Sequence, residues 1–157
     1  IGLEQDYQRA ARHIADYGLE STIVRRPFTS RILPLIASSE FLVFPSVRPH
    51  FARPVVEAAV MGKPTVGSDL SGVRELIDDG LTGMLVVPDD ANTLAASMAA
   101  MLGDPERAMR MGHAAREKIL RECDAGSYVE RMLGIYNTVL ARRRVSHRVP
   151  EMPNESC

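Results

Sequence analysis

Residues 41–70 read FLVFPSVRPHFARPVVEAAVMGKPTVGSDL, and their pattern is the clearest indication of the fold. Phe41 to Phe44 are four consecutive apolar residues, which is the pattern of a strand buried on both faces of a parallel sheet. A helix then opens at Pro54, because proline is favoured in the first helical turn. It ends at Gly62, and Lys63 to Ser68 supply the next strand. The stretch therefore predicts strand, loop, helix and strand in succession.

The same alternation continues on both sides of this stretch. Strands are expected at Thr22–Val24 and Met84–Val87, with a weak helix over 29–37 and a short one over 71–77 that Ser71 caps. Strands and helices that alternate with short joins are typical of an open, mostly parallel α/β sheet.

Only helices are expected at the two ends of the chain. The first helix spans about fifteen residues, and a left-handed Gly18 ends it. From Ala91 onward, three helices carry apolar residues at helical spacing, and we interpret their methionines as core residues. The last of the three carries Val129, Met132, Leu133, Tyr136 and Leu140. The fold class is therefore a Rossmann-like open parallel sheet with flanking helices and a helical C-terminal extension.

Length and composition set the organisation of the chain. Its 157 residues, 45% hydrophobic, suffice for one domain with a core. We expect that domain over residues 1–144 and a disordered tail over residues 145–157, which hold two prolines and few apolar residues. Because the chain starts at Ile1, at what reads as a strand-to-helix junction, we expect a fragment of a longer protein.

Charge and cysteine content exclude several function classes. The formal net charge of −1 creates no field that would recruit nucleic acid. The two cysteines are too few for a metal site or a disulfide framework, so a reduced, cytoplasmic setting fits best. No apolar run approaches the length of about 18–20 residues that a membrane span needs.

Candidate chemistry lies in the loop between the first buried strand and the helix. Ligands of such sheets bind outside the carboxyl ends of the strands. The free N–H groups and the dipole at the helix start suit a diphosphate, to which Arg53 could add a charge-assisted hydrogen bond. The Glu57 carboxylate could accept from two sugar hydroxyls. Each residue also has a plain interpretation: Glu57 as a dipole partner, Arg53 as a surface residue, His50 as a loop histidine and Ser71-Gly72 as a cap.

The whole segment resembles the donor-binding domain of family-four glycosyltransferases, the retaining group with the GT-B fold. The resemblance runs through FLVFPSVRPHFARPVVEAAVMGKPTVGSDLSGVRELIDDGLTGMLVVPDD, and more loosely through LGDPERAMRMGHAAREKIL, YVERMLGIYNTVL and the upstream YQRAARHIADYGLESTIV. It covers about residues 1 to 141. It implies a carboxy-terminal half that binds a nucleoside diphosphate sugar and moves a hexose to a hydroxyl acceptor, without a metal cofactor.

Site residues follow from that resemblance. The family pattern has two glutamates separated by seven residues, and Glu57 occupies the second position, which holds the nucleotide ribose. Pro49 stands at the first, so the glutamate that usually contacts the donor sugar is missing, and His50 beside it is the candidate catalytic or sugar-contacting residue. The resemblance adds donor contacts at Phe51, Ala52, Arg53, Arg26, Ser71 and Gly72, with Ala52 and Ser71 at positions that are often glycine in the family.

The resemblance also implies partners and a setting. The acceptor, a sugar or a lipid-linked molecule, would bind through an N-terminal domain that precedes Ile1, so the fragment alone would be inactive. Family members act in polysaccharide and cell-envelope assembly, and peripheral association with the inner membrane face stays open. Two alternatives remain: a non-catalytic or degenerate sugar-nucleotide-binding module, which Pro49 favours, and a GT-B-fold nucleotide-sugar epimerase, which should show carboxylate acid/base groups.

Overall fold

The computed structural model describes the backbone of residues 3–146 and the side chains of residues 6–141. The described chain divides into two compact units, with the boundary between residues 32 and 33. The tail expected over 145–157 lies outside the described residues from position 147 on, and positions 145 and 146 are the last residues of a helix.

The first unit holds one helix and an irregular segment. Helix α1 spans Leu3–Asp16, and Gly18 follows it with a positive φ of 63°, which confirms the predicted left-handed end. The strand predicted at Thr22–Val24 is wrong. The Leu19 carbonyl instead accepts hydrogen bonds from the N–H groups of Thr22 and Ile23, which forms a turn. β-branched residues form a strand only where another strand pairs with them.

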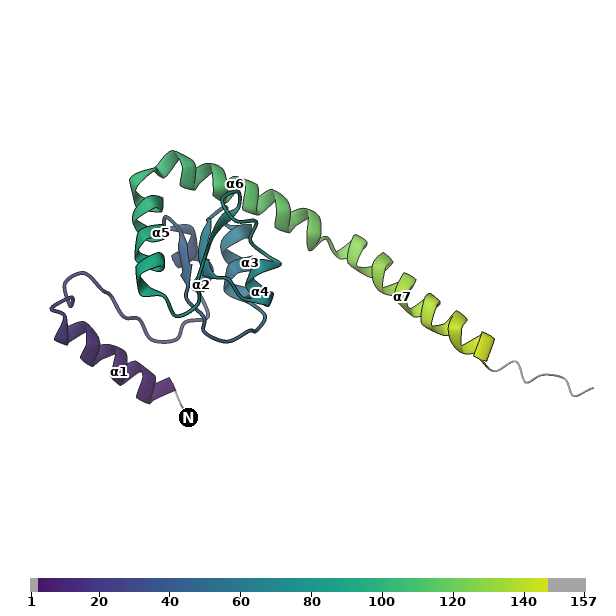
Figure 1. The fold of residues 1–157 in the computed structure, drawn as a ribbon, viewed down its shortest axis with the longest axis horizontal. Helices are drawn as coiled ribbons and strands as arrows, with labels where there is room; N and C mark the ends of the chain where they lie inside the picture. Colours follow the sequence, from purple (N-terminus) through teal and green to yellow (C-terminus); the bar gives the residue numbers. More distant parts are fainter. Residues whose placement is uncertain (1–2, 147–157) are drawn as a thin grey trace, which may run out of the picture. The chain divides into compact units, whose positions relative to one another are not determined.

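The second unit is built on a three-stranded parallel sheet in the order β1-β2-β3, with β1 at Leu42–Phe44, β2 at Thr65–Ser68 and β3 at Gly83–Val86. Leu42 pairs with Thr65, and Thr65 pairs with Gly83. Helix α2, Ile32–Ala37, precedes the sheet, α3, Arg53–Val60, joins β1 to β2, and α4, Ser71–Arg74, follows β2 (Figure 1). The predicted strand-helix-strand order from residue 41 to residue 87 is confirmed.

Three helices follow the sheet: α5 at Ala91–Gly103, α6 at Pro105–Glu122 and α7 at Ala125–Ser146. Asp90 caps α5 by accepting from the N–H groups of Asn92 and Thr93, and Asp104 caps α6 by accepting from Arg107 N–H. These local signals explain why each helix begins where it does.

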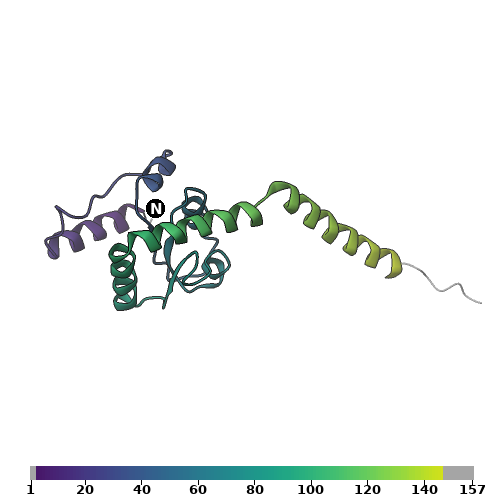
Figure 2. The same cartoon turned by 90° about the horizontal axis from the view of Figure 1, so that it is seen from above.

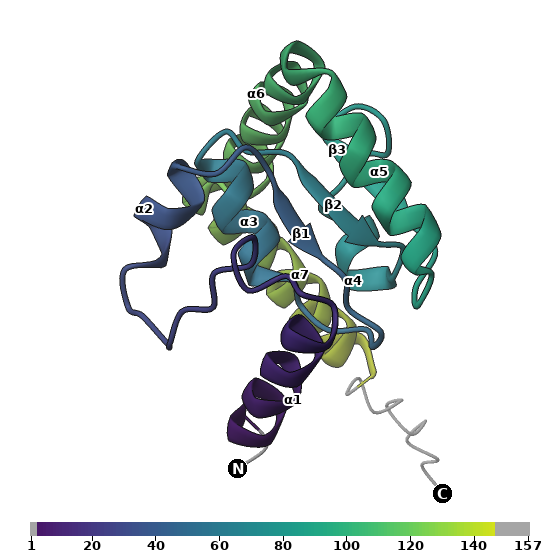
Figure 3. The same cartoon turned by 90° about the vertical axis from the view of Figure 1, so that its left-hand side faces the viewer.

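The core lies on both faces of the sheet. Figure 3 shows the strands between α3 and α5. On the α5 face pack Val66, Val86, Met101, Ala108 and Met111, and on the α3 and α4 face pack Ala52, Val55, Val73 and Ile77. A third cluster of Ala59, Ala115 and Ile119 joins α3 to α6. Burial of these apolar surfaces is the main stabilising contribution.

Helix α6 crosses the amino ends of the strands. Its first half packs into the α5 cluster through Met111, and its second half packs on α3 through Ile119. Between them, the backbone of Gly112 approaches the carbonyl of Gly62, three residues before β2 begins. Figure 2 shows α6 in green, followed along the chain by α7 in yellow-green. The amino edge of the sheet is therefore covered.

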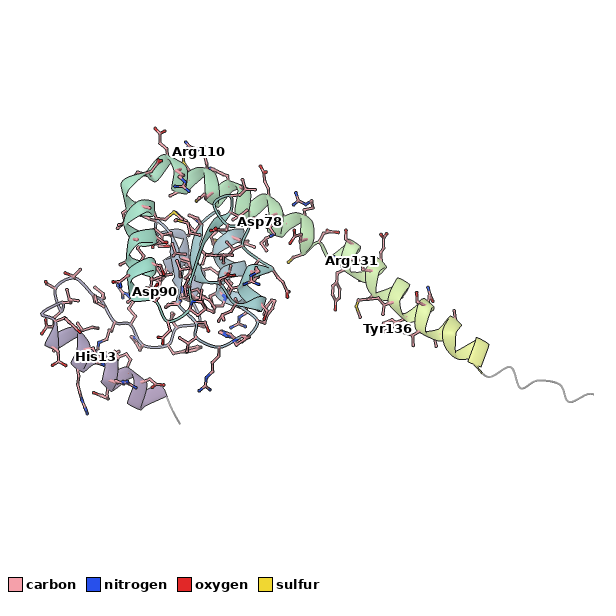
Figure 4. The ribbon with its side chains drawn as sticks, viewed as in Figure 1. His13, Asp78, Asp90, Arg110, Arg131 and Tyr136 are labelled. Carbon is pink, nitrogen blue, oxygen red and sulfur yellow. The ribbon has the colours of Figure 1, made fainter. Side chains whose placement is uncertain are left out.

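Helix α7 differs from the prediction. Its methionine, Met132, was predicted to be a core residue but is only half-buried. The other apolar residues of the set, Val129, Leu133, Tyr136 and Leu140, are all more than half exposed. Figure 4 labels Tyr136 on this helix. Helical spacing shows that apolar residues share a face, but a core position also needs an element that packs on that face. Methionines 101 and 111 do have such partners, and they are buried.

Candidate functional site

The carboxyl edge of the sheet gathers the loops that follow the strands. Because the strands are parallel, the segments after Phe44, Ser68 and Val86 all leave at this edge. The loop over 45–52 is mostly exposed, in contrast to the covered amino edge. The loop and the first residues of α3 and α4 form the candidate site.

The start of α3 carries no side-chain cap. Its N-cap is Ala52, which is fully buried and offers only a methyl group. Val55 N–H bonds to the Ala52 carbonyl at 2.9 Å, and Pro54 has no N–H to satisfy. Helix starts usually recruit a serine, threonine or acidic side chain. Because no side chain caps this helix start, the N–H groups of the first turn and the helix dipole favour binding of an external anion.

Arg53 and Glu57 lie one turn apart on α3. The Arg53 Nε is 3.5 Å from Glu57 Oε1, and the two side chains are 80% and 25% exposed. Arg53 is therefore free to move, whereas Glu57 is held mostly against the protein. An exposed pair of this kind adds little stability, so both groups can exchange partners when a ligand arrives.

His50 is held by its own loop. Its Nδ1 lies 2.8 Å from the Arg48 carbonyl oxygen and 3.3 Å from Ser46 Oγ. Because a carbonyl only accepts, Nδ1 carries the proton in this contact, which leaves the Nε2 lone pair of the neutral ring available. The ring also packs on Phe44 at a centroid distance of 5.4 Å. Phe51, the next residue, is 72% exposed.

Gly72 brings the start of α4 against this loop. A Cβ at this position would overlap the His50 carbonyl oxygen and touch the Phe51 nitrogen. The structure therefore places Gly72 beside the predicted residues His50 and Phe51. The prediction that Ser71 caps α4 is wrong: the N-cap is Leu70, in extended conformation, and its carbonyl accepts from Val73 and Arg74. Ser71 is the first helical residue, so its hydroxyl lies past the capping position.

An ion pair at the same edge was missed by sequence reasoning. Asp69 follows β2 directly, and its Oδ1 accepts from Arg74 Nε at 2.6 Å. This hydrogen bond from the guanidinium lowers the pKa of Asp69 below its ordinary value of 3.8. An acid at a strand end followed by an arginine five residues later is the signal that could have revealed the pair.

Arg26 lies in the first unit, where it is exposed, and the site above is built from the second unit alone. Its neighbour Arg25 is engaged within the first unit, because its guanidinium lies 4.5 Å from the Tyr7 ring centroid and donates to the Tyr7 carbonyl. The donor role of Arg26 stays a prediction.

Two further observations concern the part of the chain that the structure describes. Histidine, cysteine and acidic side chains form no group of three that could hold a metal ion there. None of the described helices is long and apolar enough to cross a membrane.

Comparison with known proteins gives a consistent result. The family model of the group 1 glycosyl transferases matches residues 1–118. A glycogen synthase of Mycobacterium tuberculosis is 30% identical over 124 residues, which are 79% of this chain and 30% of that protein. An alpha-maltose-1-phosphate synthase of the same species is 34% identical over 113 residues, or 68% of this chain and 29% of that protein. The chain thus spans about 30% of the length of these curated relatives.

Solved structures agree on the fold. The crystal structure of Anabaena HepE in complex with UDP superposes with a TM-score of 0.81 at 25% identity, covering 88% of this chain and 38% of that one. The same protein with UDP-glucose gives a TM-score of 0.78 at 26% identity, covering 86% and 38%. The expected GT-B class of fold, with its open parallel sheet, is confirmed.

Proposed function

Because this chain belongs to the group 1 glycosyltransferases, we propose that it holds the sugar donor in the transfer of a hexosyl group from a nucleoside diphosphate sugar to a hydroxyl acceptor. The observation that carries this proposal is the uncapped start of α3, with Arg53 and Glu57 on the same side of the first turns. The UDP and UDP-glucose in the HepE structures support a donor of this class.

The diphosphate binds at the start of α3. The backbone N–H groups that follow Ala52 point along the helix axis toward the loop, and the helix dipole favours negative charge there. Arg53 swings from Glu57 to the same phosphate, because its guanidinium is mostly in solvent and the ion pair that holds it is weak. Charge that develops on the leaving diphosphate is stabilised by these donors.

Glu57 binds the nucleotide. Its carboxylate is only 25% exposed and lies one turn into α3, so it is held in place while Arg53 moves. Two carboxylate oxygens suit the two neighbouring hydroxyls of a ribose. The role is positioning rather than proton transfer. Phe51, Ala52 and Gly72 shape the loop around the donor, with Ser71 as an outer contact.

The reaction breaks the bond between the hexose C1 and the diphosphate oxygen, whose electron pair leaves with the diphosphate. The acceptor oxygen bonds to C1 and gives its proton to the departing diphosphate oxygen, and in the retaining course the anomeric configuration is kept. His50 Nε2 is the candidate contact to the sugar, in place of the glutamate that Pro49 replaces. No metal ion is needed, since Arg53 and the helix start supply the positive charge.

The rest of the proposal concerns the longer protein. We assign residues 1–144 to the donor-binding domain and the acceptor, a sugar or lipid-linked molecule, to a separate domain, so the present chain alone is inactive. Polysaccharide assembly at the cytoplasmic side of the inner membrane is the setting that such a donor and acceptor favour.

The test is titration calorimetry of the chain with UDP, GDP and ADP, on the wild type and on Glu57→Ala. Losing a carboxylate that accepts charged hydrogen bonds is expected to weaken nucleotide binding about 10- to 100-fold. Glu106→Ala is the matched control, because Glu106 forms an equivalent i,i+4 pair with Arg110, at 3.8 Å, in the first turn of α6.

The proposal is contradicted if UDP, GDP and ADP all bind Glu57→Ala and Glu106→Ala equally well. A non-catalytic module is the second candidate, which the proline at position 49 favours. It predicts that the full-length protein binds UDP-glucose in a Glu57-dependent manner, yet neither hydrolyses nor transfers the hexose.

A further inference from the structure

A cavity of about 180 Å³ opens at the carboxyl edge of the sheet, on the α5 side. Its floor is the ends of β2 and β3, at Ser68 and Val86, and its walls include Val47 from the loop after β1 and Leu94 from α5. Ala52, Arg53 and Glu57 do not line it. The cavity is therefore separate from the proposed diphosphate site, which lies on the α3 side of the same sheet.

Ser68 places an unused hydroxyl in this cavity. The residue is only 2% exposed and shares the α5 face of β2 with Val66, because alternate strand residues point to the same side. Among the described residues, its hydroxyl has no hydrogen-bond partner. Every fully enclosed side-chain nitrogen or oxygen in that part of the chain does have one. The Ser68 oxygen is therefore reachable from outside, and the cavity is the space that it lines.

Two acids define the charge of the cavity. Asp90, labelled in Figure 4, already has hydrogen-bond partners, because its Oδ1 accepts from the N–H groups of Asn92 and Thr93 at the start of α5. Asp89 has a positive φ of 61° and is exposed at the cavity. The two carboxylates disfavour binding of an anion. The Asp89 carboxylate and the Ser68 hydroxyl can instead form hydrogen bonds with the hydroxyl groups of a neutral ligand.

Size and walls narrow the class of ligand further. The volume of about 180 Å³ equals the share of about six waters, and it lies below the range of roughly 300–1,000 Å³ typical of drug-sized ligands. Pro45, Val47, Val86 and Leu94 give apolar surface that can pack against C–H groups. A single sugar ring combines that size, C–H faces and hydroxyl groups.

We propose that this cavity is a subsite for one neutral hexose ring, with Ser68 and Asp89 as its hydrogen-bonding partners. The ring belongs either to the donor, as the hexose of UDP-glucose, which Ser68 and Asp89 would then contact in place of His50, or to a separate sugar. The first case rests on the proposed function, and the second does not.

The experiment uses the ¹H–¹⁵N spectrum of the chain, titrated separately with glucose, UDP and UDP-glucose. Val47→Phe fills the cavity and should be tolerated, because Val47 is 60% exposed. Val129→Phe is the matched control, since Val129 is 53% exposed and lies on α7. Ser68→Ala removes the hydroxyl, and Asp89→Asn removes the charge while tolerating the positive φ.

A free-sugar site predicts that glucose shifts the amides of Ser68, Asp89 and Ala91. Val47→Phe then abolishes these shifts, and Ser68→Ala weakens glucose binding about 2- to 12-fold, as expected for one hydrogen bond. A donor-sugar site predicts that Val47→Phe weakens the binding of UDP-glucose but not of UDP.

The proposal is overturned if glucose shifts none of these amides and Val47→Phe binds UDP-glucose as Val129→Phe does, which would leave a water-filled crevice. Failure of the proposed function has a different signature. If the proposed function is wrong, UDP does not bind, or it binds the wild type and Glu57→Ala equally well. The shifts that glucose causes at the cavity are then unchanged.

Discussion

The two edges of the sheet in the second unit differ in how closely the rest of the chain packs on them. At the amino edge, α6 packs Ala115 and Ile119 onto Ala59 of α3, all of them at least 94% buried. At the carboxyl edge, Phe51 and Val47 are 72% and 60% exposed, and the start of α3 has no side-chain cap. Packing that stabilises the fold is concentrated at one edge, while groups that could bind a ligand are left unsatisfied at the other. The division makes stability and binding separable by mutation.

Gly112→Ala should have the largest effect, and on stability. The new methyl would overlap the Gly62 carbonyl, so α6 has to move away from α3. We expect a loss of about 3 kcal/mol in the free energy of unfolding, at the upper end of the usual cost of overpacking, measured by urea denaturation. Gly134→Ala is the control, because nothing lies within 4 Å of that position in α7, and it should be neutral or stabilising by up to about 1 kcal/mol. Equal urea midpoints for the two variants would contradict the close approach of α6 to the Gly62 carbonyl.

Gly72→Ala places the same methyl at the opposite edge. Here the overlap is with the His50 carbonyl, in an exposed loop that can shift. We expect a smaller stability loss of about 1–2 kcal/mol, together with a roughly 10-fold weaker binding of UDP, because the loop amides leave their positions. Calorimetry and denaturation on the same sample check both. Unchanged UDP affinity would show that the loop does not depend on α4.

Lys118→Met tests an ion pair that ties α6 to the turn before β3. Lys118 Nζ lies 2.6 Å from Asp78 Oδ1, with side chains 9% and 50% exposed. Methionine keeps the packing of the stem and removes the charge. Since Asp78 is half in solvent, we expect a loss of about 1 kcal/mol in stability, with UDP affinity unchanged. Arg110→Met, which breaks an exposed pair, should cost less than about 0.5 kcal/mol of stability. A similar loss in both variants would contradict a larger contribution from the partly buried Lys118–Asp78 pair.

The smallest effect is the pH dependence at the carboxyl edge. The hydrogen bond from Arg74 lowers the pKa of Asp69, so the folded state favours the carboxylate. Its stabilising contribution is present above the ordinary pKa of 3.8 and is lost as pH falls through the lowered pKa of the folded state. The difference in Tm between the wild type and Asp69→Asn should therefore shrink below about pH 4. Arg74→Gln should remove this pH dependence, and its persistence in that variant would assign it to another acid.

The local sequence pattern was sufficient to predict most helices and strands and part of the candidate site. The apolar run before Pro45 and the proline that opens α3 predicted β1 and α3, and α3 puts Glu57 one turn after Arg53 whatever the rest of the chain does. The strand predicted at Thr22–Val24 failed because β propensity is satisfied only by a partner strand. Ser71 failed as a cap because helix ends shift by a residue with the surrounding packing.

The sequence alone was sufficient to predict the order of strands and helices from residue 41 onward, their parallel arrangement and the family. These follow from spacing within a few residues, where backbone geometry alone sets which groups are neighbours. Three contacts required the folded structure: Lys118 pairs with Asp78, Gly112 approaches Gly62, and Ser68 lines a cavity together with Asp89. Such contacts join distant parts of the chain, and they depend on how faces of helices and strands pack, which no local pattern encodes.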